Sequence, residues 1–287
     1  MNKVVIEVPA KLNLVLDIVG TENGFHNLKT LVTTINVYDT VSVSARQDEE
    51  ITVKYTGYNP CCLPCKDNAY RAAAAFIEKY SVGGADIVIN KNIPLSGGMG
   101  GSSADIVGVV EGMKRLYNVD KDVDALLNEL GSDTVYMSRG GYALLGGKGE
   151  KVQPVVSDYK FWFLLLPILD ERAVKVSSAA CYKRYDEMAK TFSPMAERAA
   201  ALLEKGDAEG LCKALKNDLY PAASDILGEL KENLYALRQV GYASMTGSGS
   251  TVFSIYKSEE EREKAYNLLN GKLQKQVIRA ETVFKNK

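Results

Sequence analysis

A run of glycines followed by two serines is the stretch of this chain best suited to chemistry. It lies in Ile93 to Asp105, IPLSGGMGGSSAD, and contains Gly97, Gly98, Gly100, Gly101, Ser102 and Ser103. Apolar residues then recur at helical spacing, so a helix is predicted to begin here. Glycine permits close approach to a ligand, and a helix N-terminus attracts anions through its N–H groups. The stretch indicates a phosphate site; the alternative is a turn whose serines cap the helix.

Two common nucleotide motifs are excluded at this position. No lysine enters the loop, so it is not a P-loop. Counted from Gly98, the sixth residue is Ser103, so a Gly-x-Gly-x-x-Gly pattern is absent and neither a dinucleotide fold nor a protein-kinase loop is supported.

Lys11 and Asn13 form a second candidate cluster, in Pro9-Ala10-Lys11-Leu12-Asn13-Leu14. Apolar and polar residues alternate here, which predicts a strand with one buried face. Taken alone, the alternation also predicts that Lys11 points to solvent. A chemical role for its ammonium is the alternative.

His26, the one histidine of the chain, follows Phe25 in the segment Gly24 to Leu28. A single histidine is more often a structural or surface residue. Next to an aromatic ring it also suits a planar base, which it can hydrogen-bond while the ring stacks.

Two further clusters fit phosphate chemistry. Asp133 follows Gly131 and Ser132; it is either a helix cap or a carboxylate that positions a substrate hydroxyl for phosphoryl transfer. The segment Thr246-Gly247-Ser248-Gly249-Ser250 is either a tight turn or a backbone that approaches phosphates.

The composition describes an ordinary globular chain of one large or two average domains. Its 287 residues include 35 Lys and Arg against 36 Asp and Glu, so no basic surplus indicates a nucleic-acid partner. The N-terminus has no secretory signal, and the strongest apolar run, Phe161 to Leu169, is too short to span a bilayer. We expect a cytoplasmic protein with no membrane partner.

Cysteine usage agrees with that location. Of five cysteines, Cys61, Cys62 and Cys65 crowd into one segment, whereas Cys181 and Cys212 stand alone. A structural zinc needs four ligands, so free thiols are expected rather than a metal site.

Helices and strands alternate along the whole chain, which indicates an α+β or α/β fold. Pro154 interrupts the pattern, so a domain boundary is expected near it. Strands are predicted at 4–8, 12–18, 40–44, 51–55, 85–90, 142–145, 161–166, in a hairpin at 242–256, and at 276–283. Helices are predicted at 68–80 with Asp67 or Asn68 as cap, after the glycine loop, and at 123–130, 177–190, 194–204, 208–216, 224–240 and 259–269.

In chain order, PAKLNL, PLSGGMGGSSAD and MTGSGS resemble the three motifs of the GHMP small-molecule kinases. The likeness extends through GFHNLKT, INVYDTV, KDNAYRAA, GGYALLGGKGE and KNDLYPAA, and so covers nearly the whole chain. It implies an α+β, two-domain GHMP kinase fold. Residues 1–155 would form a nucleotide-binding domain of the ribosomal-protein-S5 type with a left-handed βαβ unit, and residues 156–287 a ferredoxin-like domain.

The resemblance also implies ATP and Mg²⁺ as cofactors and assigns roles by motif. Lys11 and Asp133 would be the catalytic pair: Asp133 orients the substrate hydroxyl, and Lys11 holds that carboxylate and stabilises the transferring charge. The residues that would bind the substrate are Asn13, Phe25, His26 and Tyr182. The residues that would bind ATP are Pro94, Gly97, Gly98, Gly100, Gly101, Ser102, Ser103, Gly247, Ser248 and Gly249.

The implied reaction is ATP-dependent phosphorylation of a hydroxyl of 4-diphosphocytidyl-2-C-methyl-D-erythritol, a cytidine-diphosphate-linked alcohol of isoprenoid precursor synthesis. Phe25 and His26 suit this base-bearing substrate. Departures from the usual motif, at Met99, Ser102 and Ala104 and after Asp133, leave two alternatives open: a kinase of another small alcohol, or a nucleotide-binding relative without catalysis. The sequence leaves a homodimer open as well.

Overall fold

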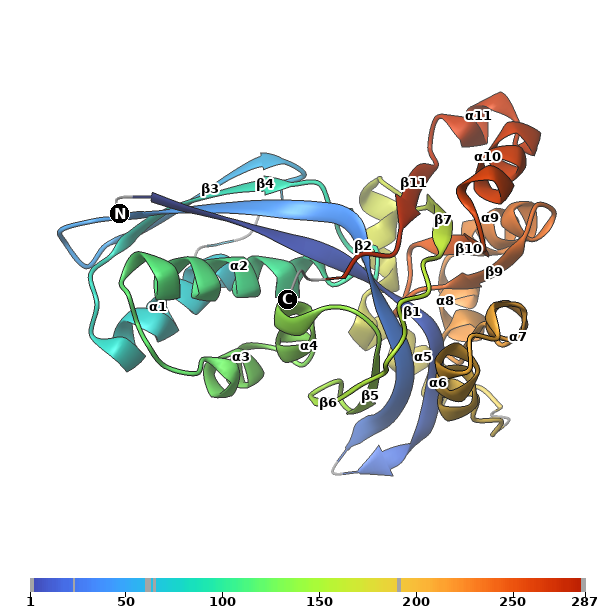
Figure 1. The fold of residues 1–287 in the computed structure, drawn as a ribbon, viewed down its shortest axis with the longest axis horizontal. Helices are drawn as coiled ribbons and strands as arrows, with labels where there is room; N and C mark the ends of the chain where they lie inside the picture. The colour runs from blue at the N-terminus through green and yellow to red at the C-terminus, as the bar shows by residue number, and fades with distance from the viewer. Residues whose placement is uncertain (1–2, 23, 60–62, 64–65, 190–191, 285–287) are drawn as a thin grey trace. The chain divides into compact units, whose positions relative to one another are not determined.

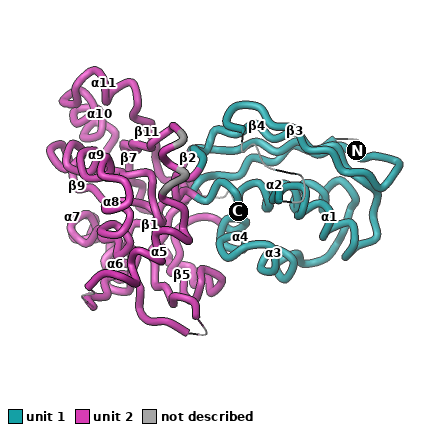
Figure 2. The backbone as a smooth tube through the Cα atoms, turned by 180° about the vertical axis from the view of Figure 1, so that it is seen from behind, with its two compact units in different colours: residues 1–10, 37–95, 100–139 teal, residues 11–36, 96–99, 140–287 magenta. Residues whose placement is uncertain are grey.

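The computed structural model of the chain describes residues 3–22, 24–59, 63, 66–189 and 192–284 (Figure 1). It forms two compact units (Figure 2), of which unit 1 holds residues 1–10, 37–95 and 100–139 and unit 2 holds residues 11–36, 96–99 and 140–287. Strands β1 (Lys3–Glu22) and β2 (Phe25–Ala45) each contribute to both units, so the units are not successive segments of chain. The domain boundary near residue 155 stays a prediction.

Unit 1 is a sheet with helices on one face (Figure 1). Strand β4 (Ala85–Lys91) pairs in parallel with β3 (Ile51–Gly57) and antiparallel with the second part of β2. Because helix α1 (Asn68–Tyr80) connects the two parallel strands, β3, α1 and β4 make a βαβ unit. The other helices of unit 1 are α2 (Gly101–Leu116), α3 (Asp124–Leu130) and α4 (Thr134–Arg139).

A four-stranded antiparallel sheet organises much of unit 2. Its strand order is β11-β7-β10-β9, from β7 (Trp162–Leu166), β9 (Tyr242–Met245), β10 (Val252–Tyr256) and β11 (Ile278–Glu281). Helices follow β7, and α10 (Glu259–Leu268) connects β10 to β11, which gives the β-α-β-β-α-β order of a ferredoxin-like domain. The expected ferredoxin-like part is therefore present.

Unit 2 also contains the second part of β1 and the first part of β2. Strand β5 (Ala143–Gly147) pairs with β2 and with β6 (Lys151–Pro154), and β8 (Lys216–Asn217) pairs in parallel with β1. The remaining helices are η2 (Glu171–Val176, a 3-10 helix), α5 (Ser178–Asp186), α6 (Ala196–Glu204), α7 (Ala208–Lys213), α8 (Tyr220–Ile226), α9 (Glu229–Arg238) and α11 (Gly271–Gln274). None of the helices in the described ranges is long and apolar enough to cross a membrane.

Local sequence signals account for several of these elements. Helix α1 has the predicted bounds, and Asp67 caps it by accepting hydrogen bonds from the backbone N–H groups of Ala69 and Tyr70. A carboxylate at this position satisfies amides that have no partner inside the helix. The prediction for this helix and its cap is confirmed.

Other predictions were wrong. The helix predicted over 224–240 is two helices, α8 and α9, because Leu227 is extended (φ −133°, ψ 94°) and ends the first of them before Gly228. The strands predicted at 4–8 and 12–18 are one strand, because the fixed φ of proline lies in the β region and β1 continues through Pro9. Helix α4 was not predicted at all.

Helix α2 packs unusually close to strand β2 in unit 1. A methyl group placed on Gly108 would lie 2.3 Å from Cγ2 of Val41, and one on Gly112 would lie 2.6 Å from Cγ2 of Val43. Both valines are buried completely. The two glycines therefore set the distance between helix and sheet.

We expect Gly108→Ala to destabilise the protein by about 1–3 kcal/mol, because the overpacked methyl outweighs the better helix propensity of alanine. Thermal or urea unfolding measures the change. Gly271→Ala is the matched control, since nothing lies within 4 Å of a methyl group at that helical position. A Gly108→Ala protein as stable as the control would contradict the packing argument.

Candidate phosphate and substrate site

Helix α2 begins without a side-chain cap. Its N-cap is Gly100, in the left-handed conformation (φ 80°), and no side chain of the described residues caps it, whereas α1, α5 and α10 each have such a cap. Ser102 and Ser103 lie inside the first helical turn, so the interpretation that they cap the helix is wrong. The first-turn N–H groups are thus placed as an anion site requires.

Three motifs that are far apart in the sequence meet within unit 2. The backbone N–H of Lys11 donates to the carbonyl oxygen of Met99 at 3.0 Å. The hydroxyl of Thr246 donates to the carbonyl of Gly98 at 3.3 Å, and the N–H of Ser250 donates to the carbonyl of Ser96 at 2.9 Å. The first part of the glycine loop, the Lys11 strand and the loop 246–250 therefore form one backbone assembly.

This assembly depends on two glycines in direct contact. A methyl group on Gly98 would lie 2.4 Å from the carbonyl oxygen of Thr246, and one on Gly247 would lie 2.8 Å from the carbonyl oxygen of Gly98. Both glycines also have positive φ, at 71° and 56°. Gly97, directly before Gly98, is buried, and so is Pro94 of unit 1. The hydroxyl of Ser248 lies 3.0 Å from that of Ser178. Positions 98 and 247 therefore require glycine, since any side chain there would meet the opposite backbone.

Lys11 and Asn13 are buried, at 5% and 3% exposure, so the expectation of a solvated lysine from alternation alone is wrong. The Lys11 ammonium donates to Oδ1 of Asn13 at 2.6 Å. The same oxygen accepts from the N–H of Gly247 at 3.0 Å, and the Asn13 amide donates to the hydroxyl of Thr30 at 2.8 Å. The amide oxygen of Asn13 is therefore an acceptor that orients the ammonium. Asn13 thus ties Lys11 to the loop 246–250.

Asp133 lies in unit 1, directly before helix α4. Its carbonyl accepts from the N–H of Met137 at 2.8 Å, so its backbone begins the helix. The turn that holds it reaches α2, since a methyl group on Gly131 would lie 3.9 Å from the hydroxyl oxygen of Ser103. Asp133 and the first turn of α2 are therefore close within the same unit.

His26 is part of an aromatic cluster in unit 2. Its ring stacks on Tyr182 of α5, with centroids 4.8 Å apart and planes at 18°, and meets Tyr185 edge-on at 5.8 Å. Nε2 of His26 lies 2.9 Å from Oδ1 of Asp186. If Nε2 carries the proton, this bond leaves Nδ1 as an acceptor. Tyr182, to which the resemblance assigns a contact with the substrate, thus lies against His26.

Phe25 is 54% exposed, and the Lys148 ammonium lies 3.4 Å from its ring centre. A cation over an aromatic face is an attractive contact. The pair therefore places a positive charge over an exposed aromatic ring at the start of β2.

Two groups of residues escaped the sequence analysis. Asp186 is 160 positions from His26, and no local pattern connects them. Lys91 is buried with Asp39 and Asp105. Here a signal existed, because Lys91 alternates with Ile87 and Ile89 and so belongs to the buried face of β4.

The two cysteines in the described part of the chain have no chemical role in this site. Cys181 and Cys212 are buried, and burial raises the pKa of each thiol to about 12, so both stay protonated near neutral pH. Cys61, Cys62 and Cys65 lie outside the described residues. Within the described part of the chain, no group of three or more His, Cys, Asp or Glu residues could hold a metal ion.

Family models and relatives agree with the geometry. The GHMP kinase N-terminal domain model matches residues 67–143, and the GHMP kinase C-terminal model matches residues 199–274. The chain belongs to the GHMP kinase family, a class of ATP-dependent small-molecule kinases. It is 32% identical to the 4-diphosphocytidyl-2-C-methyl-D-erythritol kinase of Shouchella clausii, over 93% of this chain and 90% of that one. It is 30% identical to the enzyme of the same name from Bacillus cytotoxicus, over 94% and 93%.

Solved structures show the same fold. A crystal structure of 4-(cytidine 5'-diphospho)-2C-methyl-D-erythritol kinase matches with a TM-score of 0.76 and 24% identity, over 99% of this chain and 100% of that chain. Homoserine kinase from Cytophaga hutchinsonii matches with a TM-score of 0.69 and 16% identity, over 99% and 95%. The two-domain α+β fold of this family is therefore confirmed.

We expect Gly98→Ala to disrupt the backbone assembly and to lower both stability and ATP affinity. The added methyl meets a carbonyl oxygen and also strains a positive φ. Unfolding and nucleotide titration measure the two effects. Gly141→Ala is the matched control, since its φ of 77° carries the same strain but nothing lies within 4 Å of the new methyl. Equal losses in both variants would show that the contact with Thr246 is unimportant.

Proposed function

We propose that this kinase transfers the γ-phosphate of ATP to a hydroxyl of 4-diphosphocytidyl-2-C-methyl-D-erythritol. The observation that carries the proposal is the stacking of His26 on Tyr182 with Asp186 at the imidazole edge. A flat ring with a hydrogen-bonding edge is what a cytosine needs from its binding site. The named relatives, which the chain matches over nearly their whole length, support the same substrate.

Lys11 and Asp133 are the proposed catalytic residues. Phosphoryl transfer needs a positioned hydroxyl and neutralised phosphate charge more than covalent chemistry. Asp133 would accept or orient the proton of the hydroxyl, and the Lys11 ammonium, aimed by Asn13, would hold that carboxylate and stabilise charge on the phosphoryl group.

ATP would bind through the glycine loop from Pro94 to Ser103 and through Gly247, Ser248 and Gly249. The uncapped start of α2 supports this assignment, since its N–H groups suit phosphate oxygens. Asn13, Phe25, His26 and Tyr182 are the proposed contacts to the second substrate.

Mg²⁺ fits as an ion that arrives with ATP. The described residues offer no group of three carboxylates or imidazoles for a protein cage, and Mg²⁺ commonly keeps waters and phosphate oxygens with few protein ligands. When bound, it neutralises phosphate charge. The hydroxyl of Ser102 or Ser103, at the start of α2, would be its contact from this chain.

A kinase of a different alcohol is the second candidate, which the changed segment after Asp133 favours. An assay of the purified enzyme with ATP, Mg²⁺ and the cytidine-linked alcohol distinguishes the two candidate functions. Release of ADP with formation of the phosphorylated product supports the proposal. Activity on another alcohol with none on this one would overturn it.

Asp133→Asn is expected to lower kcat at least about 100-fold with the KM for ATP changed less than about twofold, because it removes the acceptor of the hydroxyl proton while keeping the shape. Steady-state kinetics measure both constants. The exposed Glu129 of α3 supplies the control, and Glu129→Gln should leave both constants unchanged. A fully active Asp133→Asn enzyme would remove this residue from catalysis.

His26→Ala is expected to raise the KM for the cytidine-linked alcohol about tenfold, and Asp186→Asn about threefold, with the KM for ATP unchanged. The first change removes the ring, and the second weakens the bond that orients it. Glu187→Gln is the control, because the neighbouring Glu187 pairs with Arg184 instead. Should all three variants keep the KM of the unmodified enzyme, the base would have to bind elsewhere.

A further inference from the structure

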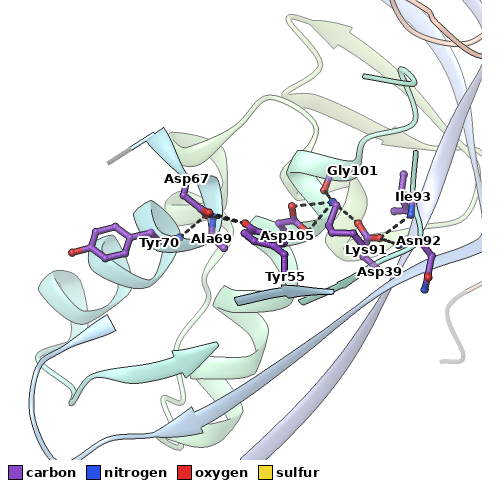
Figure 3. Close-up of polar contacts among 10 residues, drawn as sticks. All are labelled: Asp39, Tyr55, Asp67, Ala69, Tyr70, Lys91, Asn92, Ile93, Gly101 and Asp105. Atoms are coloured by element: carbon purple, nitrogen blue, oxygen red, sulfur yellow. Dashed lines mark hydrogen bonds and ion pairs between the residues drawn. The ribbon is translucent and has the colours of Figure 1, made fainter. Parts of the chain in front are cut away.

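A buried charge cluster lies in unit 1 and does not include either residue of the proposed catalytic pair. Lys91, at the end of β4, is 2% exposed, while Asp39 of β2 and Asp105 of α2 are 0% and 5% exposed. The Lys91 ammonium lies 2.6 Å from Oδ2 of Asp39 and 2.9 Å from Oδ2 of Asp105 (Figure 3). The three residues join two strands and a helix.

The third contact of the ammonium is to the backbone. Lys91 Nζ donates to the carbonyl oxygen of Gly101, the first residue of α2, at 3.1 Å. An ammonium has three donors, and here they go to two carboxylates and this carbonyl. A methyl group on Gly101 would lie 3.3 Å from Nζ, so the residue that starts the helix sits directly against the lysine.

The cluster also holds the chain before the glycine loop. Oδ1 of Asp39 accepts from the backbone N–H of Asn92 at 2.7 Å and of Ile93 at 2.9 Å (Figure 3). Ile93 enters the loop, and Gly101 leaves it for α2. One buried cluster therefore fixes the backbone at both ends of the glycine stretch.

Stability alone gives a poor account of such a cluster. Burying charges is costly, and well-packed apolar residues often stabilise a core as well or better. The charged groups instead make directional hydrogen bonds to the backbone of Gly101, Asn92 and Ile93, and each bond fixes the position of one backbone atom. Burial raises the pKa of Asp105 to about 7 although Lys91 acts to lower it, so the cluster need not hold a net negative charge near a bound phosphate.

We propose that Lys91, with Asp39 and Asp105, is the positioning device of the phosphate-binding turn: it holds the first turn of α2 in the geometry that binds ATP. This inference rests on the proposed function, because it assigns ATP phosphates to that turn. Lys91 acts through the backbone of Gly101 and Ile93, and is a positioning residue rather than a catalytic one.

Asp105→Asn and Lys91→Arg test the proposal. The first keeps the shape and leaves Lys91 paired with Asp39; the second keeps the charge but replaces a compact ammonium with a planar fork. Val110→Ala is the matched control, because Val110 is buried in the same helix but far along it from Gly101. Binding of a non-hydrolysable ATP analogue is measured by calorimetry, and amide hydrogen exchange of residues 101–104 is measured without nucleotide.

Both cluster variants are expected to bind the analogue about tenfold more weakly and to exchange these amides faster, with the KM for the alcohol unchanged. Val110→Ala should lose stability yet keep analogue affinity within about twofold. If the unmodified protein binds the analogue and the cluster variants behave like Val110→Ala, the inference is overturned and the proposed function stands. If the unmodified protein binds no analogue, the proposed function falls and takes the inference with it.

Discussion

The burial of one ammonium group constrains unit 1 more than any other interaction. Lys91 lies on the same face of β4 as Ile87 and Ile89, so its side chain must enter the core. Burying an ammonium without partners costs too much free energy, so the elements that pack around it must supply acidic side chains. Asp39 supplies one from the sheet and Asp105 one from the helix. The glycines of α2 at positions 108 and 112 let the helix come close enough for these bonds to form.

Unit 2 also holds a buried lysine, and there an amide side chain connects it to the backbone. Oδ1 of Asn13 accepts from the Lys11 ammonium at 2.6 Å and from the backbone N–H of Gly247 at 3.0 Å. The Asn13 amide donates to the hydroxyl of Thr30 at 2.8 Å, which fixes the orientation of the Asn13 side chain. One side chain therefore aligns the ammonium with the loop 246–250. Both buried lysines are thus tied by hydrogen bonds to the backbone of a glycine-containing segment.

Prediction from sequence succeeded where the cause was local. The cap at Asp67 and the helix it begins depend on neighbouring residues, and both were found. The phosphate loop, Lys11 and the loop 246–250 were recognised by motif, but their convergence depends on hydrogen bonds across more than 200 positions, such as that from Gly247 to Asn13. No sequence pattern indicated that Asp186 lies beside His26. For Lys91 such a pattern exists, since alternation along β4 places it in the core, but lysines are so rarely buried that alternation alone does not predict it.

The departures from the family motif fall mostly on positions that serve packing. Met99 is 1% exposed, Ala104 is 0% exposed, and Tyr136, in the changed segment after Asp133, is buried completely. The hydroxyl of Thr134, in that same segment, donates to the carbonyl oxygens of Leu127 and Gly131 and so secures the turn before α4. A side chain that faces the core packs against its neighbours in the fold and has little contact with a substrate. The residues expected to select the base, Phe25, His26 and Tyr182, lie in unit 2 on other elements. The changes around Asp133 therefore bear on how its carboxylate is held and not on recognition of the base.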